Sequence, residues 1–183
     1  MKKDSLNKLK EMKSSVVIAT VPARSYHQTN IKLVKYLTQE VSIPGVYVTL
    51  NKPFPDMKRI FEEAKVDTRL MIFIDAITKT AGGKTKKVKD CLYIGTPENL
   101  SDLSMAMDQA VTSLIEKEKF LFFDSLTTLL IYNDVKTVGR FIHFLAGKMR
   151  VWKVRGIIIS LQKKGNEDLL NELSQFCDMR IDL

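Results

Sequence analysis

Short apolar runs rich in β-branched and aromatic residues alternate along the chain with segments of helical periodicity, and this alternation constrains the fold most. The expected strands lie at 15–21, 45–50, 71–77, 119–124 and 156–161, with two shorter ones at 91–94 and 179–183. Most are continuously apolar, as in Phe120-Leu121-Phe122-Phe123, which indicates strands covered on both faces. We therefore predict an α/β fold with a doubly wound, mostly parallel sheet that is flanked by helices and joined by right-handed crossovers.

Helices are expected between these strands. The segments 27–40 and 54–65 have helical periodicity, and three further helices have recognisable starts. Thr96-Pro97-Glu98 combines a capping side chain, a first-turn proline and an acid, all of which favour a helix N-terminus. Asn133 and Asn166 are the expected caps of the other two helices.

The charge of the chain is concentrated in three basic segments. The 183 residues carry a formal net charge of +8, to which 1–13 contributes +3, 79–90 contributes +4 and 148–164 contributes +6. We expect 1–13 to be a basic N-terminal helix and 79–90, which contains two adjacent glycines, to be an exposed loop. Such segments form either a solvated face or a surface for nucleic acid or an acidic partner.

The length and composition exclude several classes of protein. A chain of 183 residues is the size of one domain, so we expect a single unit over 1–183. No apolar run approaches the ~20 residues of a membrane span, and no secretory signal is visible, so we expect a cytoplasmic protein without a membrane partner. Cys91 and Cys177 lack zinc-site spacing. His27 and His143 lack an acidic partner at triad or metal-site spacing.

Polar residues follow the expected strands at their carboxyl ends, which is where open α/β sheets bind ligands. Residues 22–29 follow the first strand and lead into a helix, and Asn51-Lys52 follows the second. Asp124-Ser125 follows the phenylalanine-rich strand, and Gln162 follows the next one. Asp75, at the end of the third strand, is interpreted as a turn residue.

Five segments fall in a characteristic order along the chain: 46–50 (VYVTL), 72–75 (IFID), 96–103 (TPENLSDL), 122–130 (FFDSLTTLL) and 175–178 (QFCD). In their residues and order they resemble the RecA/KaiC-like family of P-loop ATPases, and most of all its archaeal KaiC-like branch without an intact Walker A motif. The resemblance covers nearly the whole chain from residue 16 onward and implies a RecA-like core with the P-loop NTPase fold. Proteins of this fold assemble side by side with nucleotide at the subunit boundary, so the resemblance also implies an oligomer.

The phosphate-binding loop of this family, G-x-x-x-x-G-K-[ST], is altered in this sequence. Pro22, His27 and Gln28 stand where the family has glycine, glycine and lysine, and only Thr29, the expected magnesium ligand, is kept. The glycines let backbone N–H groups wrap the phosphates, and the lysine supplies positive charge. Their loss predicts a nucleotide affinity weaker by ~two to three decades.

The catalytic positions of the family are altered as well. The resemblance implies a pair of glutamates after the second strand, one of which acts on the attacking water, but Asn51 and Lys52 occupy these positions. Asp124 matches the Walker B aspartate that holds magnesium through water, and Gln162 matches the residue that senses the γ-phosphate. The alternative is that Asp124 caps the following turn and that Gln162 bonds a loop backbone.

The resemblance therefore implies a set of candidate nucleotide-binding residues without a catalytic residue. Arg24 and His27 can also form a small anion site at the start of the helix. We expect no firmly bound cofactor, and Mg-ATP at most weakly. Thr29 and Asp124 are the candidate magnesium ligands, and the full set is Arg24, His27, Gln28, Thr29, Asp124, Ser125 and Gln162.

Three functions remain open. The favoured one is a degenerate RecA/KaiC-like module, a pseudo-ATPase with weak or no ATP hydrolysis that acts through protein–protein interaction or signalling, with itself or another protein. The second is a nucleic-acid-binding accessory protein of recombination type that uses 79–90 and 148–164. The third is an ATP-binding protein with a rearranged loop, in which Lys52 or Arg24 replaces the missing lysine.

Overall fold

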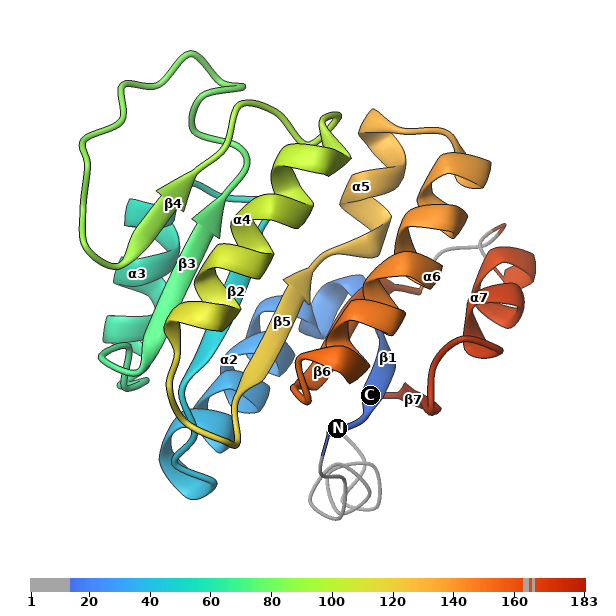
Figure 1. Ribbon diagram of the computed structural model, residues 1–183, viewed down its shortest axis with the longest axis horizontal. Helices are drawn as coiled ribbons and strands as arrows, with labels where there is room; N and C mark the ends of the chain where they lie inside the picture. Colours follow the sequence, from blue (N-terminus) through green and yellow to red (C-terminus); the bar gives the residue numbers. More distant parts are fainter. Residues whose placement is uncertain (1–13, 163–164, 166) are drawn as a thin grey trace.

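Seven parallel strands form one sheet in the order β4-β3-β2-β5-β6-β1-β7 in the computed structural model, which describes residues 14–162, 165 and 167–183 (Figure 1). This arrangement confirms the predicted fold class. The expected helix at 1–13 and the expected cap Asn166 lie outside the described residues. The strands are β1 Val16–Val21, β2 Gly45–Thr49, β3 Met71–Asp75, β4 Cys91–Tyr93, β5 Phe120–Asp124, β6 Arg155–Leu161 and β7 Met179–Asp182.

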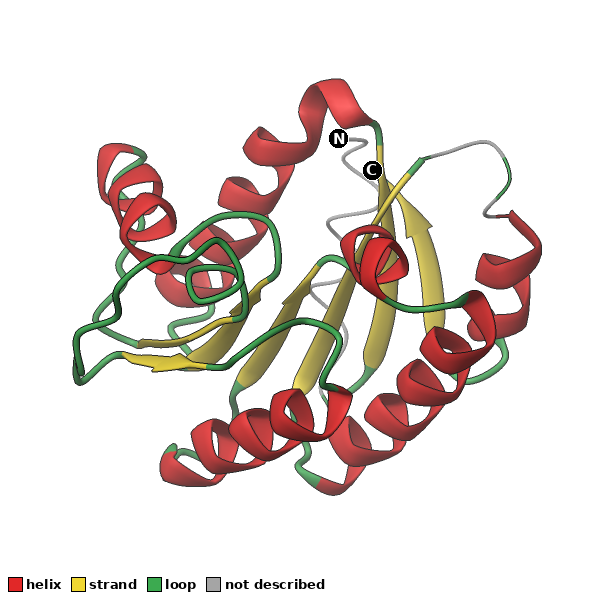
Figure 2. Cartoon of the chain, turned by 90° about the horizontal axis from the view of Figure 1, so that it is seen from above, coloured by secondary structure: helices red, strands yellow, loops and turns green. Residues whose placement is uncertain are grey.

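Helices cover both faces of the sheet (Figure 2). α2 (Tyr26–Lys35), its π-helical continuation η2 (Tyr36–Glu40) and α3 (Phe54–Glu63) pack on one face. The other face carries α4 (Leu100–Ser113), α5 (Leu126–Tyr132), α6 (Val135–Val151) and α7 (Glu167–Ser174). A short 3₁₀ turn, η1 (Ala23–Ser25), joins β1 to α2.

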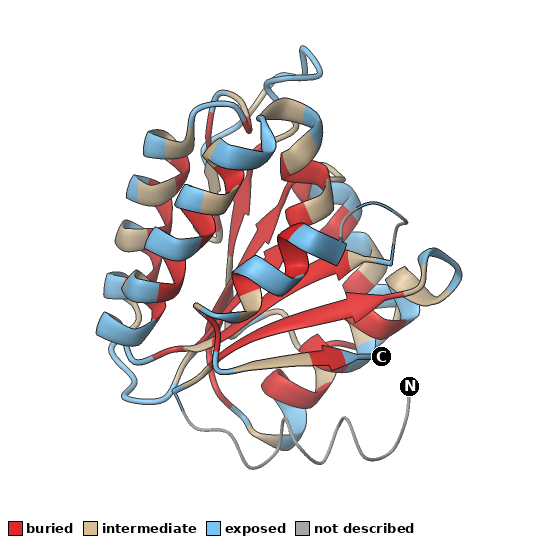
Figure 3. Cartoon of the chain, turned by 90° about the vertical axis from the view of Figure 1, so that its right-hand side faces the viewer, coloured by how far each residue is buried: buried red, intermediate tan, exposed pale blue. Residues whose placement is uncertain are grey.

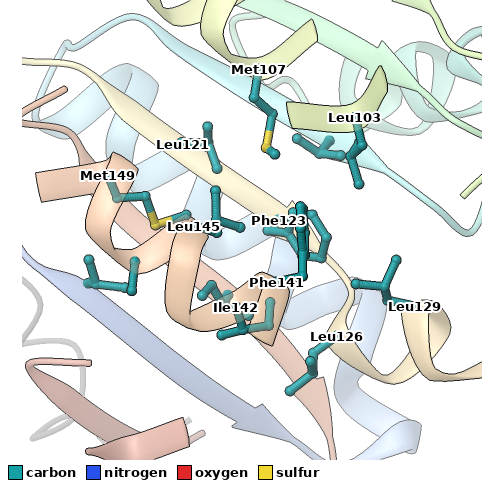
Figure 4. Packing of buried hydrophobic residues seen from close by; sticks show 14 of the residues in the cluster. Leu103, Met107, Leu121, Phe123, Leu126, Leu129, Phe141, Ile142, Leu145 and Met149 are labelled. Atoms are coloured by element: carbon teal, nitrogen blue, oxygen red, sulfur yellow. The ribbon is translucent and has the colours of Figure 1, made fainter. Parts of the chain in front are cut away.

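The central strands are apolar on both sides because each side meets a layer of helices (Figure 3). In β5, Leu121 and Phe123 face the layer of α4 and α6, whereas Phe120 and Phe122 face the layer of α2 and α3. Figure 4 shows the first of these layers, where side chains of α4 and α6 close over the strand. Gly45 is required where β2 passes Phe120, because an added Cβ would lie 2.3 Å from the phenyl ring.

Two helix starts differ from the prediction, and one short helix was not predicted. α4 begins at Leu100 rather than near Thr96, and its cap is Asn99, whose side chain accepts a hydrogen bond from the backbone of Asp102 at 3.1 Å. α6 is capped by Asp134 instead of the neighbouring Asn133. The seven residues of α5 were missed because a helix of two turns has almost no periodic signal.

The segment 79–90 is an exposed loop, as predicted. It belongs to the connection from β3 to β4, which returns to the start of the next parallel strand without a helix (Figure 1). Only Thr85 and Asp90 of this loop are partly shielded, so its lysines lie at the surface.

None of the helices in the described part of the chain is both long enough and apolar enough to cross a membrane. Likewise, nowhere among the described residues do three or more His, Cys, Asp or Glu side chains gather as they would around a metal ion.

Candidate functional site

The candidate site lies at the carboxyl edge of the sheet, centred on Asp124. Asp124 is the last residue of β5 and lies opposite Thr49 of β2 in the strand register, so the loop after β2 passes close to it. The side chain is buried, with 2% of the residue exposed. The peptide bond between Asp124 and Ser125 is cis.

Three side chains from separate elements donate hydrogen bonds to the Asp124 carboxylate. The Tyr26 hydroxyl, at the start of α2, donates to Oδ1, and the Tyr47 hydroxyl, in β2, donates to Oδ2. The Asn51 amide, in the loop after β2, donates to Oδ1 at 3.0 Å. Both carboxylate oxygens are therefore bound by protein groups.

Asn51 and Ser125 extend this network to α5. The Asn51 amide also donates to the Tyr26 hydroxyl at 2.6 Å, and its oxygen accepts a hydrogen bond from the Thr128 hydroxyl. The Ser125 hydroxyl lies 2.9 Å from that of Thr128 and accepts from the Thr128 backbone N–H at 3.3 Å, so it caps α5. Asn51 is thus a structural link between Asp124 and the helix that follows it.

Burial dominates the electrostatics of the network. It raises the pKa of Asp124 above the ordinary range, while the hydrogen bonds from Tyr26, Tyr47 and Asn51 and the nearby His27 act in the opposite direction. Burial first, and the Asp124 charge second, raise the pKa of Tyr26 and of Tyr47. Both tyrosines are therefore protonated donors at neutral pH.

Little space remains beside this network. The cavity that Tyr26, Asn51, Lys52 and Asp124 help to line has a volume of about 10 Å³, which is room for one water molecule. Asn30 also lines it, and its buried Oδ1 has no hydrogen-bond partner within the described part of the chain. The cavity is too small for a nucleoside triphosphate.

The other predicted site residues lie outside this network. Arg24, His27 and Gln28 are exposed on η1 and the first turn of α2, and the His27 ring contacts the Tyr26 ring edge-on at 5.0 Å. Thr29 is buried within α2, and none of the hydrogen bonds found between described residues joins its side chain to Asp124. The two candidate magnesium ligands are therefore not linked.

Gln162 is the last candidate. Its side chain is exposed, and its backbone N–H donates to the Val21 carbonyl at 2.9 Å, where the ends of β6 and β1 meet. The structure therefore brings Asp124 together with Ser125, Asn51 and Tyr26, and leaves Gln162 at the rim.

The two tyrosines were missed in the sequence. Tyr47 stands in the middle of an apolar strand and has the pattern of a core residue. Tyr26 lies inside the segment 22–29 that was singled out. The one available signal was a bulky side chain next to position 27, where the P-loop ATPases that the sequence resembles have glycine. Thr128 had no signal beyond its place one turn after Asp124.

Asp75, at the end of β3, has the turn role that was expected of it. Its carboxylate accepts hydrogen bonds from the backbone N–H groups of Phe54 at 2.7 Å, Ile77 at 2.9 Å and Thr78 at 2.8 Å. The Thr78 hydroxyl donates a further bond at 2.6 Å. All of these bonds hold the loops that follow β2 and β3.

Several cations of the basic segment 148–164 are held in ion pairs within the chain. Lys148 pairs with Asp108 at 2.8 Å, Arg150 pairs with Asp178 at 2.9 Å, and Arg155 pairs with Glu118 at 3.0 Å. Lys163 and Lys164 lie outside the described residues. The ion pairs reduce the positive charge that the described part of this segment offers to a phosphate backbone.

Comparison with known proteins places the chain in two ways. The sequence model of a family of unknown function, DUF7504, matches residues 35–183. A search of the curated proteins finds no match. Among solved structures, a KaiC-like protein from the hyperthermophilic archaeon Pyrococcus horikoshii OT3 is similar with a TM-score of 0.64 and 14% identity, over 93% of this chain and 72% of that one. This similarity establishes a RecA/KaiC-like fold.

Proposed function

Because the chain belongs to DUF7504, a family of unknown function, and has a RecA/KaiC-like fold, we propose that it is a module of this fold that does not bind ATP in the conventional way and acts through protein–protein contacts. The observation that carries the proposal is the hydrogen bond from the Tyr26 hydroxyl to the Asp124 carboxylate. In the ATPases that the chain resembles, this aspartate faces the magnesium ion and its water. Here a tyrosine takes the place of that water.

The hydrogen bonds of the network support this proposal. A magnesium-bound water would have to displace Tyr26 or Asn51 from Oδ1, or Tyr47 from Oδ2. Each displaced group would then be left without its charged partner in a buried site, which costs free energy. The closed network is therefore the favoured state of this site.

The backbone between β1 and α2 supports it as well. Pro22 has no N–H to donate, and its carbonyl accepts a hydrogen bond from the Ser25 N–H at 3.0 Å. The Tyr26 N–H bonds the Ala23 carbonyl in the same 3₁₀ turn. In a phosphate-binding loop, such N–H groups point at the phosphates. In this chain they are used within the turn.

Titration of the full chain with Mg-ATP, followed by calorimetry and by thermal unfolding, tests this proposal. We expect no heat of binding and no rise in Tm at ATP concentrations up to about 10 µM, because the expected loss is ~two to three decades of affinity. Two variants are measured in the same way. Tyr26→Ala removes the side chain that fills the site, and Tyr132→Ala, at the end of α5, is its control. Binding at micromolar ATP with phosphate release by the unaltered chain would contradict the proposal.

Nucleic-acid binding is the second candidate, and one observation favours it. Lys84, Lys86, Lys87 and Lys89 are exposed on the loop 79–90, and no acid of the described chain forms an ion pair with them. Anisotropy measurements with single- and double-stranded DNA at about 50 mM salt test it, since phosphate binding is strongest at low salt. Lack of binding there would exclude it, and a triple Lys→Ala variant at 84, 86 and 87 should lower the salt dependence of any affinity found.

A further inference from the structure

An apolar groove runs along the outer surface of the molecule between α4 and α6, on the side of these helices that faces away from the sheet. It has a volume of about 490 Å³. Met105 of α4 and Phe144 of α6 are its most exposed apolar residues, at 63% and 49%. We call this surface the α4/α6 face and define it by Leu100, Ser101, Met105, Arg140, Phe141 and Phe144.

The core does not require Met105 or Phe144. The buried stripe of α4 already includes Leu103 and Met107, and that of α6 includes Ile142 and Leu145, as Figure 4 shows. Large apolar side chains that remain outside such a stripe and line a common groove mark an interaction surface. The α4/α6 face is therefore available for a partner.

The charges of the two helices differ in sign. α4 carries two aspartates, Asp102 and Asp108, and no Lys or Arg, whereas α6 carries four Lys or Arg residues and no acid. Asp108 is already paired with Lys148. Asp102 and Arg140 form no ion pair with any residue that the structure describes. Arg140 lines the groove, and Asp102 follows the lining residue Ser101 in the first turn of α4, so it lies beside the groove.

We propose that the partner is a second copy of this chain, and that two copies pack their α4/α6 faces together about a two-fold axis that runs along the helices. That axis places α4 of one copy against α6 of the other, acid against base, at both sides of the interface. A two-fold axis perpendicular to the helices would place α6 on α6, so that like charges face each other. The opposite charges of α4 and α6 therefore select a second copy in one orientation.

The positions of the lining residues along the two helices determine which residues of the two copies meet. Met105 and Phe144 both line the groove, so in this arrangement Met105 of one copy faces Phe144 of the partner subunit. Asp102 then lies near Arg140 of the partner subunit, and Arg140 lies near Asp102 of the partner subunit. The interface has an apolar centre and a rim of reciprocal ion pairs, which is the usual arrangement of a protein interface.

The size of the face predicts a weak dimer. Helices of 14 and 17 residues are about 21 and 25 Å long, and side by side they cover a footprint of roughly 400–500 Å². This lies below the ~800 Å² that each partner contributes to a standard interface. We therefore expect a dimer whose population depends on protein concentration in the micromolar range.

This inference rests on the proposed function, in which the chain acts through protein contacts, and specifies the partner and the surface. Sedimentation velocity of the full chain, at protein concentrations from about 1 to 200 µM and with and without Mg-ATP, measures the fraction of dimer directly. A dimer of the same strength in both conditions is expected, because the α4/α6 face contains no part of the Asp124 site. Failure of the dimer would leave the nucleotide result unchanged, so the two proposals can fail separately.

Substitutions within the face locate the interface. Met105→Glu and Phe144→Glu each place a charge at the apolar centre, and we expect both variants to remain monomeric over the whole concentration range. Val88→Glu, an apolar-to-acidic change on the loop 79–90, is the matched control and should dimerise like the unaltered chain. Because these side chains are exposed, the far-ultraviolet circular dichroism of all three variants should be unchanged.

Charge reversal tests the orientation. Asp102→Arg alone and Arg140→Asp alone should each raise the dimer Kd about tenfold, and the double variant should return it to within about threefold of the original value. A chain that stays monomeric, an oligomer that neither glutamate variant disrupts, or a double variant without recovery would overturn the proposal. A monomer that uses Met105 and Phe144 to bind a different protein would overturn it too.

Discussion

Asp75 and Asp124 are two aspartates that end buried strands at the same edge of one sheet, and their environments differ in kind. Both are buried, with exposures of 0% and 2%. Three of the four donors to Asp75 are backbone N–H groups. The donors to Asp124 are the side chains of Tyr26, Tyr47 and Asn51, which lie 73 to 98 positions away in the sequence.

A buried carboxylate at the end of a strand can therefore either hold the local backbone or form the centre of a side-chain site. Asp75 accepts hydrogen bonds from backbone N–H groups of its own turn and of the start of α3, so it holds these two segments in place. Asp124 instead gathers side chains of three separate elements at the carboxyl edge of the sheet. A carboxylate that is bound mainly by side chains can lose its partners by many substitutions, whereas a backbone N–H donor is lost only where proline is introduced. The two aspartates can therefore be distinguished by experiment.

The largest expected effect is on Asp75. Asp75→Ala leaves the Phe54, Ile77 and Thr78 N–H groups without an acceptor, and we expect it to lower the free energy of unfolding by about 3 kcal/mol or more. Urea denaturation measures this loss. Asp75→Asn, which keeps one acceptor oxygen, should lose less. A loss below about 1 kcal/mol for the alanine variant would mean that the turn is held by other contacts.

An intermediate effect is expected from the tyrosines around Asp124. Tyr47→Phe and Tyr26→Phe each remove one hydrogen bond to a buried carboxylate, which is worth about 1.5–3 kcal/mol of unfolding free energy. Tyr132→Phe, at the end of α5, is the matched control and should be neutral within about 0.5 kcal/mol. If both site variants were as stable as the control, the network would not hold the site closed.

The smallest effect is a dependence of stability on pH. Burial raises the folded-state pKa of Asp124, so the stability that this group contributes is fully present below its unfolded pKa, about 3.9, and is lost as the pH rises through the folded value. Relative to the unaltered chain, Asp124→Asn should therefore gain stability as the pH is raised from about 4 toward neutrality. The gain should be about 1.4 kcal/mol for each pH unit that separates the unfolded pKa from the folded pKa. Denaturant unfolding at several pH values measures the difference.

Asp178 provides the control of opposite sign. Burial acts to raise its pKa, but the hydrogen bonds from the Val16 N–H and from Arg150 outweigh it and lower the pKa below the ordinary value. Its contribution is present above the unfolded pKa and is lost as the pH falls. Asp178→Asn should therefore lose stability relative to the unaltered chain as the pH is raised from about 3 to 6. If the stability of both asparagine variants changed in the same direction with pH, relative to the unaltered chain, the opposite pKa shifts of Asp124 and Asp178 would be contradicted.

Much of the fold could be predicted because its signals are local. Runs such as Phe120-Leu121-Phe122-Phe123 are continuously apolar only because both faces of the strand are covered, and that cause is visible in the sequence itself. The cap of α4 was misplaced by three residues because Thr96 and Asn99 are both good caps.

The candidate site was predictable in part. Asp124, Ser125 and Asn51 follow strands, and polar residues at strand ends are visible without a structure. Tyr47 could not be found, because a tyrosine in an apolar strand looks the same whether its hydroxyl meets water or a carboxylate. The ion pairs of the segment 148–164 were equally hidden, since their acids lie 28 to 40 positions away in the sequence.

The sequence by itself determined the strands, the parallel α/β fold and the fact that no G-x-x-x-x-G-K-[ST] motif follows the first strand, because each depends on residue types at short spacing. Only the tertiary structure decided that Tyr26 and Tyr47 meet at Asp124 and that Met105 and Phe144 share one groove. Those contacts join residues that are far apart in the chain, and the strand order and helix packing bring them together.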